Sequence, residues 1–167
     1  MKKFLYFDVL FTFFMCFLTH SFYDLIENSL TLIFFPINES IWEHGKMVIT
    51  SCLLTGMLEL LYFKFKKIEI HNLIIFKICV ALTSIFLICT FSLVDNFLFH
   101  ISLLLISLII STFIFKFLLK QKEIRNSCLI SLIIIILIYL LYTYLSYHPL
   151  INDLFLDKVD YVYGLGN

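Results

Sequence analysis

Histidine and carboxylate side chains crowd one short block of this sequence, F-P-I-N-E-S-I-W-E-H-G-K at positions 35–46. The block contains Glu39, Glu43 and His44. Zinc takes His and carboxylate ligands in proteins, and a site with three protein ligands leaves a fourth position open for a water. Bound zinc activates that water for attack on an ester or an amide, with a spare carboxylate as the general base. We therefore take Glu39, Glu43 and His44 as candidate catalytic residues.

Histidines in other segments of the chain, and one aspartate, are further candidate ligands. His20 and Asp24 are four residues apart, so they share a face if one helix contains both. The sequence has no HExxH motif, so the ligands of a metal would have to come from separate segments. We predict a divalent-metal site, such as a zinc site, with ligands drawn from these residues: His20, Asp24, His44, His100 and His148.

The same block also has a purely structural interpretation. Ser40 and Glu43 have the spacing of an S-x-x-E capping box, which satisfies free N–H groups at the start of a helix. Trp42 would then be an ordinary anchor at a membrane interface. Capping does not account for Glu39 and His44, so both interpretations stay open.

The composition predicts that these residues are positioned by membrane helices. Hydrophobic residues make up 62% of the 167 residues and charged residues 14%, against roughly 45–50% and 25% in soluble domains. A spanning helix needs about 20 mostly apolar residues. The chain is therefore predicted to be an all-α membrane bundle, a single transmembrane domain over 1–167, with five spans at about 4–23, 46–65, 71–93, 96–117 and 127–147.

The lysines and arginine predict how these spans are oriented. With five spans, nine of the twelve fall on one side of the membrane: Lys2, Lys3, Lys64, Lys66, Lys67, Lys116, Lys120, Lys122 and Arg125. Positive charge collects on the cytoplasmic side, so the N-terminus is predicted inside and the C-terminus outside. The loop 24–45, the tail 148–167 and the candidate metal ligands then lie on the outer side. A net charge of zero gives no reason to expect a nucleic-acid partner.

A second group of ionisable residues lies at the opposite depth. Asp8, Glu59 and Lys77 each fall five or six residues inside the cytoplasmic end of a span. The second and third spans form a hairpin, so we expect a structural ion pair between Glu59 and Lys77. The alternative is that Lys77 alone extends to the interface.

The block at 35–46 also carries a resemblance. Read as F-P-x-N-E-S-x-W-E-H, together with Tyr147-His148-Pro149 and the segment 154–157, it resembles a family of uncharacterised five-helix bacterial integral membrane proteins, a domain of unknown function. The resemblance implies a multi-pass protein of the bacterial cytoplasmic membrane and implies no activity. It marks for testing Asn38, Glu39, Trp42, Glu43, His44 and Asp157.

Three kinds of function remain open from the sequence, and it does not decide whether the protein is an enzyme. The leading hypothesis is an outward-facing His/carboxylate site that binds a metal and acts on a lipid or small amphiphile. The second is a small transporter or channel subunit with Asp8, Glu59 and Lys77 as an inner gate. The third is a non-catalytic assembly or interaction protein. The expected partner is the lipid bilayer, and a homo-oligomer or a second membrane protein stays open.

Overall fold

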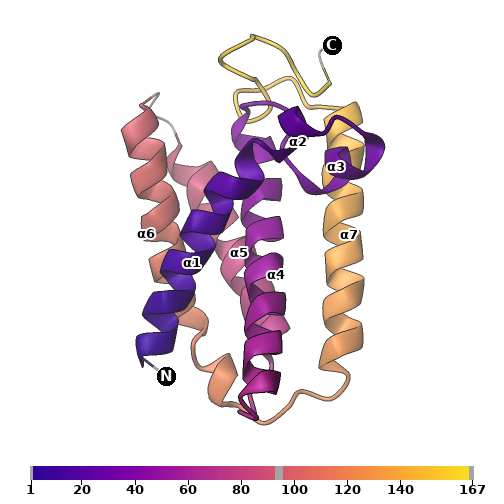
Figure 1. Ribbon diagram of the computed structural model, residues 1–167. Coiled ribbons are helices and arrows are strands. Elements are labelled where there is room, and N and C mark those ends of the chain that lie inside the picture. Colours follow the sequence, from indigo (N-terminus) through magenta and orange to yellow (C-terminus); the bar gives the residue numbers. More distant parts are fainter. Residues whose placement is uncertain (1, 93–95, 166–167) are drawn as a thin grey trace.

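The protein was analysed as a computed structural model that describes residues 2–92 and 96–165 (Figure 1). Residue 93 of the third predicted span and the last two residues of the predicted tail lie outside the described residues. The elements, in chain order, are α1 (Lys2–His20), α2 (Phe22–Leu25), α3 (Ser29–Phe34), α4 (Ile41–Phe65), α5 (Leu73–Phe91), α6 (Phe97–Phe115), the short 3-10 helix η1 (Leu118–Lys120) and α7 (Ser127–Tyr147).

Five of these helices are long and apolar enough to cross a membrane, namely α1, α4, α5, α6 and α7. The predicted all-α membrane bundle with five spans is thereby confirmed. Because a helix pairs its own backbone N–H and C=O groups, it is the natural way for so apolar a chain to cross hydrocarbon.

The helix ends differ from the predicted spans mainly around the loop between α1 and α4. Helix α4 begins at Ile41, five residues before the predicted 46, because the Ser40 hydroxyl accepts the Glu43 N–H at 3.2 Å and caps the first turn. Helix α1 ends at His20, before the predicted 23, and the chain turns at Ser21 into α2. The loop then forms α3, which Asn28 caps by accepting the N–H groups of Leu30 and Thr31.

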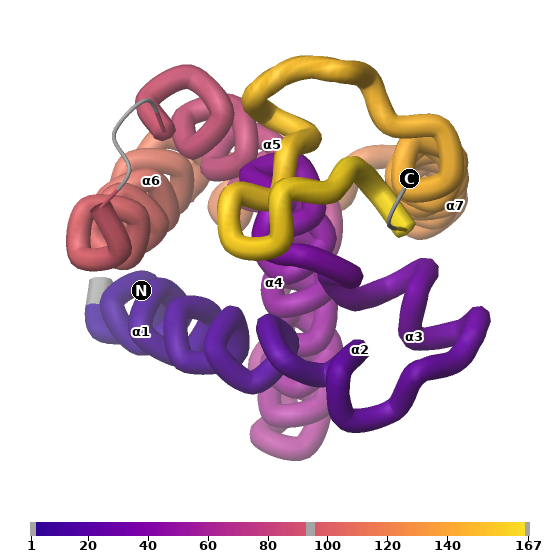
Figure 2. The backbone as a smooth tube through the Cα atoms, turned by 90° about the horizontal axis from the view of Figure 1, so that it is seen from above, coloured from indigo at the N-terminus to yellow at the C-terminus, as the bar shows by residue number. Residues whose placement is uncertain are grey.

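Helices α1, α4, α5 and α6 form a ring in which each contacts two neighbours, while α7 lies outside the ring (Figure 2). Small polar residues let these helices approach closely. The Thr12 and Thr55 hydroxyls lie 3.1 Å apart between α1 and α4, and Thr19 lies 2.8 Å from Ser51 in the same interface. This interface connects the two ends of the molecule that carry its ionisable groups.

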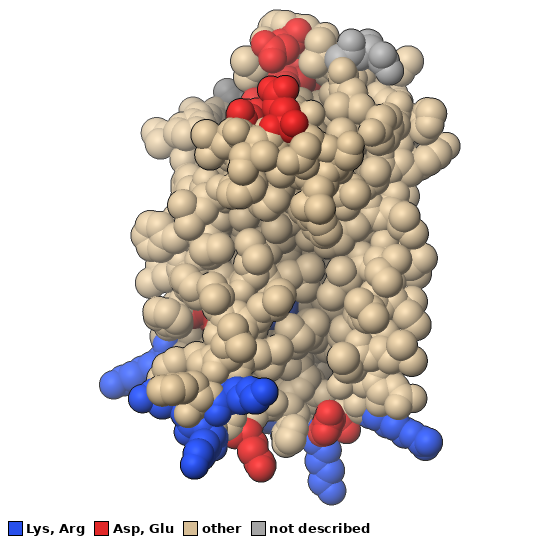
Figure 3. Space-filling view, turned by 45° about the vertical axis from the view of Figure 1, so that its right-hand side comes forward, with Lys and Arg blue, Asp and Glu red and all other residues tan. Residues whose placement is uncertain are grey.

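Charge is separated between the two ends of the bundle (Figure 3). One end carries lysine and arginine side chains with a few acidic ones among them, acidic side chains without lysine or arginine are seen at the other end, and the belt between is almost uncharged. We call the first the lysine-rich end; it holds the N-terminus and the links after α4 and α6. Many large apolar side chains in the belt are exposed, among them Phe14, Leu61, Phe86 and Leu140, as expected of a surface that faces lipid.

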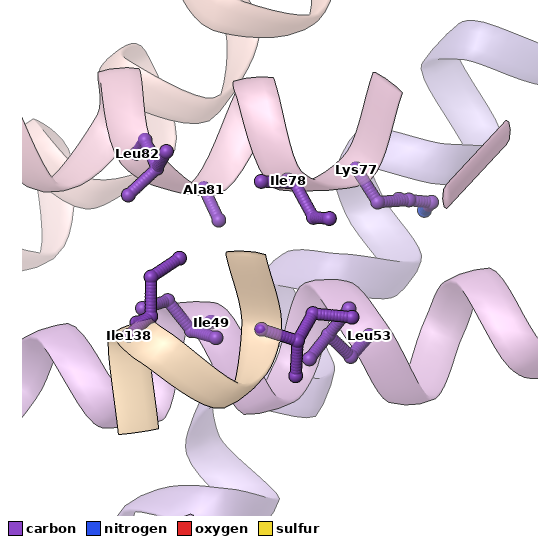
Figure 4. A pocket seen from close by; sticks show the side chains of 8 residues that line it. Ile49, Leu53, Lys77, Ile78, Ala81, Leu82 and Ile138 are labelled. Atoms are coloured by element: carbon purple, nitrogen blue, oxygen red, sulfur yellow. The ribbon is translucent and has the colours of Figure 1, made fainter. Parts of the chain in front are cut away.

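A small apolar cavity lies where α7 passes α4 and α5 (Figure 4). Its volume is about 10 Å³, which is room for no more than one water. The lining residues are apolar except for Lys77, which contributes its aliphatic stem: Ile49, Leu53, Lys77, Ile78, Ala81, Leu82, Ile135 and Ile138. This space is too small to hold a substrate.

Helix α7 is packed closely against α4 at Gly45. A Cβ atom at Gly45 would collide with the hydroxyl of Tyr142, which is buried on α7. Gly45→Ala is therefore expected to lower the free energy of unfolding by about 1–3 kcal/mol, the usual cost of overpacking. Titration with SDS, followed by circular dichroism, measures this change. The double variant Gly45→Ala/Tyr142→Phe should recover part of the loss, and a Gly45→Ala protein as stable as wild type would contradict the close packing.

Candidate metal centre

Three side chains from three segments meet at the end of the bundle opposite the lysine-rich end. His20 is the last residue of α1, Glu39 lies in the loop before α4, and His44 lies in the first turn of α4. The Nε2 atoms of His20 and His44 are 3.0 Å apart. The Glu39 Oε2 atom lies 3.4 Å from His20 Nε2 and 3.5 Å from His44 Nε2. These three atoms form a nearly equilateral triangle.

The size of this triangle suits a tetrahedral metal ion. Zinc bonds of about 2.0–2.2 Å with tetrahedral angles place ligand atoms roughly 3.3–3.6 Å from one another. The triangle formed by His20, Glu39 and His44 has edges of 3.0, 3.4 and 3.5 Å. An ion above its centre would reach all three atoms and keep a fourth position open. The side chains are 30%, 44% and 26% exposed, so that position is accessible from outside the bundle.

The protonation of His44 also suits a ligand. Its Nδ1 lies 2.7 Å from the carbonyl oxygen of Ser40. A carbonyl can only accept, so Nδ1 carries the proton and Nε2 presents its lone pair to the triangle. Histidines that bind metals are held in this way, with the second ring nitrogen donating to a backbone carbonyl or a carboxylate.

The tail after α7 determines where Glu39 lies, and Figure 2 shows this segment crossing over the end of α4. The backbone N–H of Glu39 donates to Asp157 Oδ2 at 3.0 Å. The other oxygen of Asp157 accepts the N–H groups of Val159 and Asp160, at 2.7 and 3.2 Å. Next to Glu39, the Asn38 side chain donates to the carbonyl of Gly164 at 2.8 Å. Asn38 and Asp157 therefore position the loop and do not belong to the triangle.

Trp42 joins the tail to the bundle. Its ring lies between those of Tyr142 and Phe155, with centroid distances of 4.6 and 4.8 Å. Its backbone N–H donates to the Leu154 carbonyl at 2.9 Å. The structural interpretation makes Trp42 an ordinary anchor at a membrane interface. Its ring packs between α7 and the tail, which brings the tail over Glu39.

Glu39 is ionised at neutral pH. The His20 ring hydrogen-bonds to its carboxylate and holds the pKa of this carboxyl below its ordinary value, and a proton added to either imidazole acts in the same direction. Partial burial opposes this effect and is the smaller influence. The carboxylate is therefore available as an anionic ligand.

Glu43 does not share a site with Glu39, although the two residues are four apart in the sequence. Glu39 precedes α4, so the helical spacing that would put both on one face does not apply to it. Glu43 is buried and its Oε2 lies 2.8 Å from Lys46 Nζ, while its Oε1 accepts the Ser146 hydroxyl at 2.7 Å. The predicted capping box is half formed, because Ser40 caps Glu43 but the Ser40 N–H donates to Asn38. Glu43 is a link between α4 and α7 and not a general base at the triangle.

Three predicted ligands lie outside the triangle, which is the group that the described residues bring within 4.8 Å of one another. Asp24 is in α2, after the turn at Ser21 breaks the helical spacing from His20. His148 follows α7, and its ring lies 4.9 Å from that of Tyr144. His100 is on α6 and is near enough to His44 for their charges to interact. Glu39, predicted as a candidate catalytic residue, is the third member of the triangle instead of these three.

The inner ionisable residues come together at the opposite depth. Lys77 Nζ lies 3.0 Å from Glu59 Oε2, the separation of an ion pair. Asp8, which was placed only at similar depth, is the nearer partner and accepts a hydrogen bond from Lys77. The alternative, Lys77 extending alone to the interface, does not occur.

Comparisons with known proteins give the family of this chain. No curated protein and no solved structure matches it. The model of a family of unknown function, DUF6512, matches residues 1–165, which is nearly the whole sequence. The resemblance to an uncharacterised membrane family is thereby confirmed, and no activity comes with it. This chain, with its five helices long and apolar enough to cross a membrane, belongs to the family of unknown function DUF6512.

Proposed function

We propose that this protein binds a divalent metal such as zinc at the outer face of the cell membrane and uses the site to act on a lipid or a small amphiphile. The observation that carries the proposal is the triangle of His20 Nε2, His44 Nε2 and Glu39 Oε2, with edges of 3.0 to 3.5 Å. The Ser40 carbonyl supports it, because it fixes the His44 lone pair toward the triangle.

The outer location rests on the charge of the two ends. The triangle lies at the end opposite the lysine-rich end, and positive charge marks the cytoplasmic side. Lysine and arginine side chains at the lysine-rich end are exposed: Lys3, Lys64, Lys66, Lys67, Lys120, Lys122 and Arg125. In a bacterium this membrane is the cytoplasmic membrane, with the N-terminus inside.

The chemistry rests on the open fourth position. A metal held by three protein ligands supplies an activated water or polarises a carbonyl. His20, His44 and Glu39 would bind and orient the metal. Asp157 and Asn38 hold the loop that carries Glu39.

A lipid or amphiphile is the substrate class because of the surface beside the triangle. The segment that follows His20 exposes the apolar side chains of Phe22, Leu25, Ile26 and Leu30. Leu25 is 77% exposed and Leu30 is 65% exposed. Such side chains are stable at the boundary between headgroups and hydrocarbon. These exposed side chains support a substrate with a polar head, which would bind at the open position, and an apolar tail.

The test is the metal content of detergent-purified protein, prepared without chelators and measured by mass spectrometry. Wild type is expected to contain one metal ion per chain, and His44→Ala to lose it. Removing a group that hydrogen-bonds to a metal ligand weakens metal binding by about 10–100-fold. Removing the ligand itself should therefore lower the affinity by more than about 100-fold. His71→Ala changes an exposed histidine at the lysine-rich end and should keep the metal.

A wild type that contains no metal and takes up none on addition of zinc would overturn the proposal. His20 and His44 would then be a hydrogen-bonded pair beside Glu39. If the metal is bound, hydrolysis of ester-linked lipid in vesicles tests the second half. Release of fatty acid by wild type and His71→Ala but not by folded His44→Ala is the expected result.

A further inference from the structure

Three ionisable side chains converge inside the membrane half that adjoins the lysine-rich end. Asp8 comes from α1, Glu59 from α4 and Lys77 from α5, and their exposures are 2%, 4% and 1%. Glu59 lies five residues before Lys64, which is roughly 7–8 Å along the helix. Ionisable groups at such depth are costly, and in membrane proteins they mark ion pathways and proton relays. We call these three residues the inner triad.

The two carboxylates of the inner triad have unequal surroundings. Asp8 accepts a hydrogen bond from Lys77 and a second from the Thr12 hydroxyl at 3.4 Å. Lys77 also donates to the Thr55 hydroxyl at 3.1 Å. Neither carboxylate oxygen of Glu59 has a hydrogen-bond partner within the described chain, although Lys77 Nζ lies 3.0 Å from one of them. The ionised carboxylate of Glu59 is therefore buried and lies beside Lys77, but neither of its oxygens has a hydrogen bond.

The charges of the inner triad do not balance. Two carboxylates and one ammonium group sum to one negative charge. Among the described residues, the other titratable group whose charge interacts with the triad is the Cys52 thiol on α4, and it supplies no positive charge. The carboxylates of Asp8 and Glu59 also interact with one another, and this interaction is repulsive when both are ionised.

Another buried ion pair among the described residues has balanced charge. Glu43 and Lys46 are one carboxylate and one ammonium group, and both oxygens of Glu43 have partners. The excess charge and the unsatisfied carboxylate therefore belong to the inner triad and are not a general property of the interior.

We propose that Asp8, Glu59 and Lys77 form a proton-binding site in which the Glu59 carboxyl takes up and releases one proton. A proton on Glu59 removes the excess charge and gives this carboxyl an O–H to donate to Asp8. Asp8 stays ionised, because Lys77 and Thr12 both donate to it. The proposal is independent of the metal site, which lies at the other end of α1 and α4.

The inner triad lies one helical turn from a depression at the lysine-rich end. An open depression of about 300 Å³ lies there and is lined by Leu60, Phe63, Lys64, Ile68, Glu69, Ile70 and His71. Phe63 is four residues after Glu59, so the two side chains share one face of α4. One helical turn thus separates Glu59 from water, and protons exchange with that side of the membrane.

Infrared spectroscopy of the protein reconstituted in lipid tests the site directly. At neutral pH, wild type is expected to show the carbonyl stretch of one protonated carboxylic acid, which shifts on ¹³C labelling of glutamate and in heavy water. Glu59→Gln should remove the band. Asp8→Asn should remove it as well, because Glu59 and Lys77 then balance each other without a proton. The matched control Glu123→Gln changes an exposed carboxylate and should leave the band unchanged.

The wild-type spectrum alone decides the proposal even if a variant fails to fold. Absence of a protonated glutamate at neutral pH would overturn it. A band that appears only after sodium is removed would also overturn it, because a monovalent cation and not a proton would then be the ligand. A band that persists in folded Glu59→Gln would place the proton elsewhere and overturn the assignment to Glu59.

Discussion

Lys77→Met is expected to lower the free energy of unfolding by about 3–5 kcal/mol, the usual result of removing one partner from a buried charge pair. The variant keeps an unbranched apolar stem but leaves Asp8 and Glu59 without a cation, and both are almost completely buried. Thr55 also loses its donor. The cost should shrink as the pH falls, because Asp8 then also takes up a proton and neither carboxyl group stays charged. SDS titration of the purified protein at several pH values measures this.

The double variant Asp8→Asn/Lys77→Met is the informative companion. It leaves Glu59 as the only carboxyl, which can stay protonated, so it should be more stable than Lys77→Met alone. Lys64→Met, at an exposed position of the same bundle end, should change the free energy of unfolding by less than about 0.5 kcal/mol. Equal losses in Lys77→Met and Lys64→Met would show that the inner triad is not a coupled unit.

Asp157→Ala is expected to weaken metal binding by about 10–100-fold although Asp157 is not a ligand. Its carboxylate accepts N–H groups from Glu39, Val159 and Asp160, at 3.0, 2.7 and 3.2 Å. Without it, the loop that carries Glu39 loses its attachment to the tail, and the carboxylate of Glu39 leaves the triangle. Losses of this size are usual when a group that orients a metal ligand is removed. The free energy of unfolding should also fall, by about 1–3 kcal/mol for the unpaired N–H groups.

Zinc affinity from competition with a chelating dye, measured alongside SDS titration, separates the two effects. Asp153→Ala removes an exposed carboxylate from the same tail and should leave both quantities unchanged. An Asp157→Ala protein that is destabilised but binds zinc like wild type would show that the tail does not position Glu39.

Some features of this protein follow from local sequence. The all-α class and the five spans were predicted because hydrocarbon requires about 20 apolar residues in one run, and helix α7 occupies 127–147 as predicted. Asp8, Glu59 and Lys77 were placed at one depth for a similar reason, because the rise per residue converts position in a helix into depth. Such properties depend on neighbours along the chain and need no knowledge of the packing.

Other features depend on which helices are neighbours, and composition does not contain this information. His20 and His44 meet because α1 packs on α4 at that end. Asp24 was expected beside His20, but the turn at Ser21 ends α1 and removes the helical spacing.

Contacts with residues distant in sequence also explain why Glu39 belongs to the triangle and Glu43 does not. The tail reaches Glu39 from 118 residues away, and Ser146 of α7 holds Glu43 from 103 residues away. Two carboxylates in one short block thus face different partners, because hydrogen bonds to other segments decide where each one points. Local sequence determined where charged groups lie along the membrane normal, and only the tertiary structure decided which of them meet.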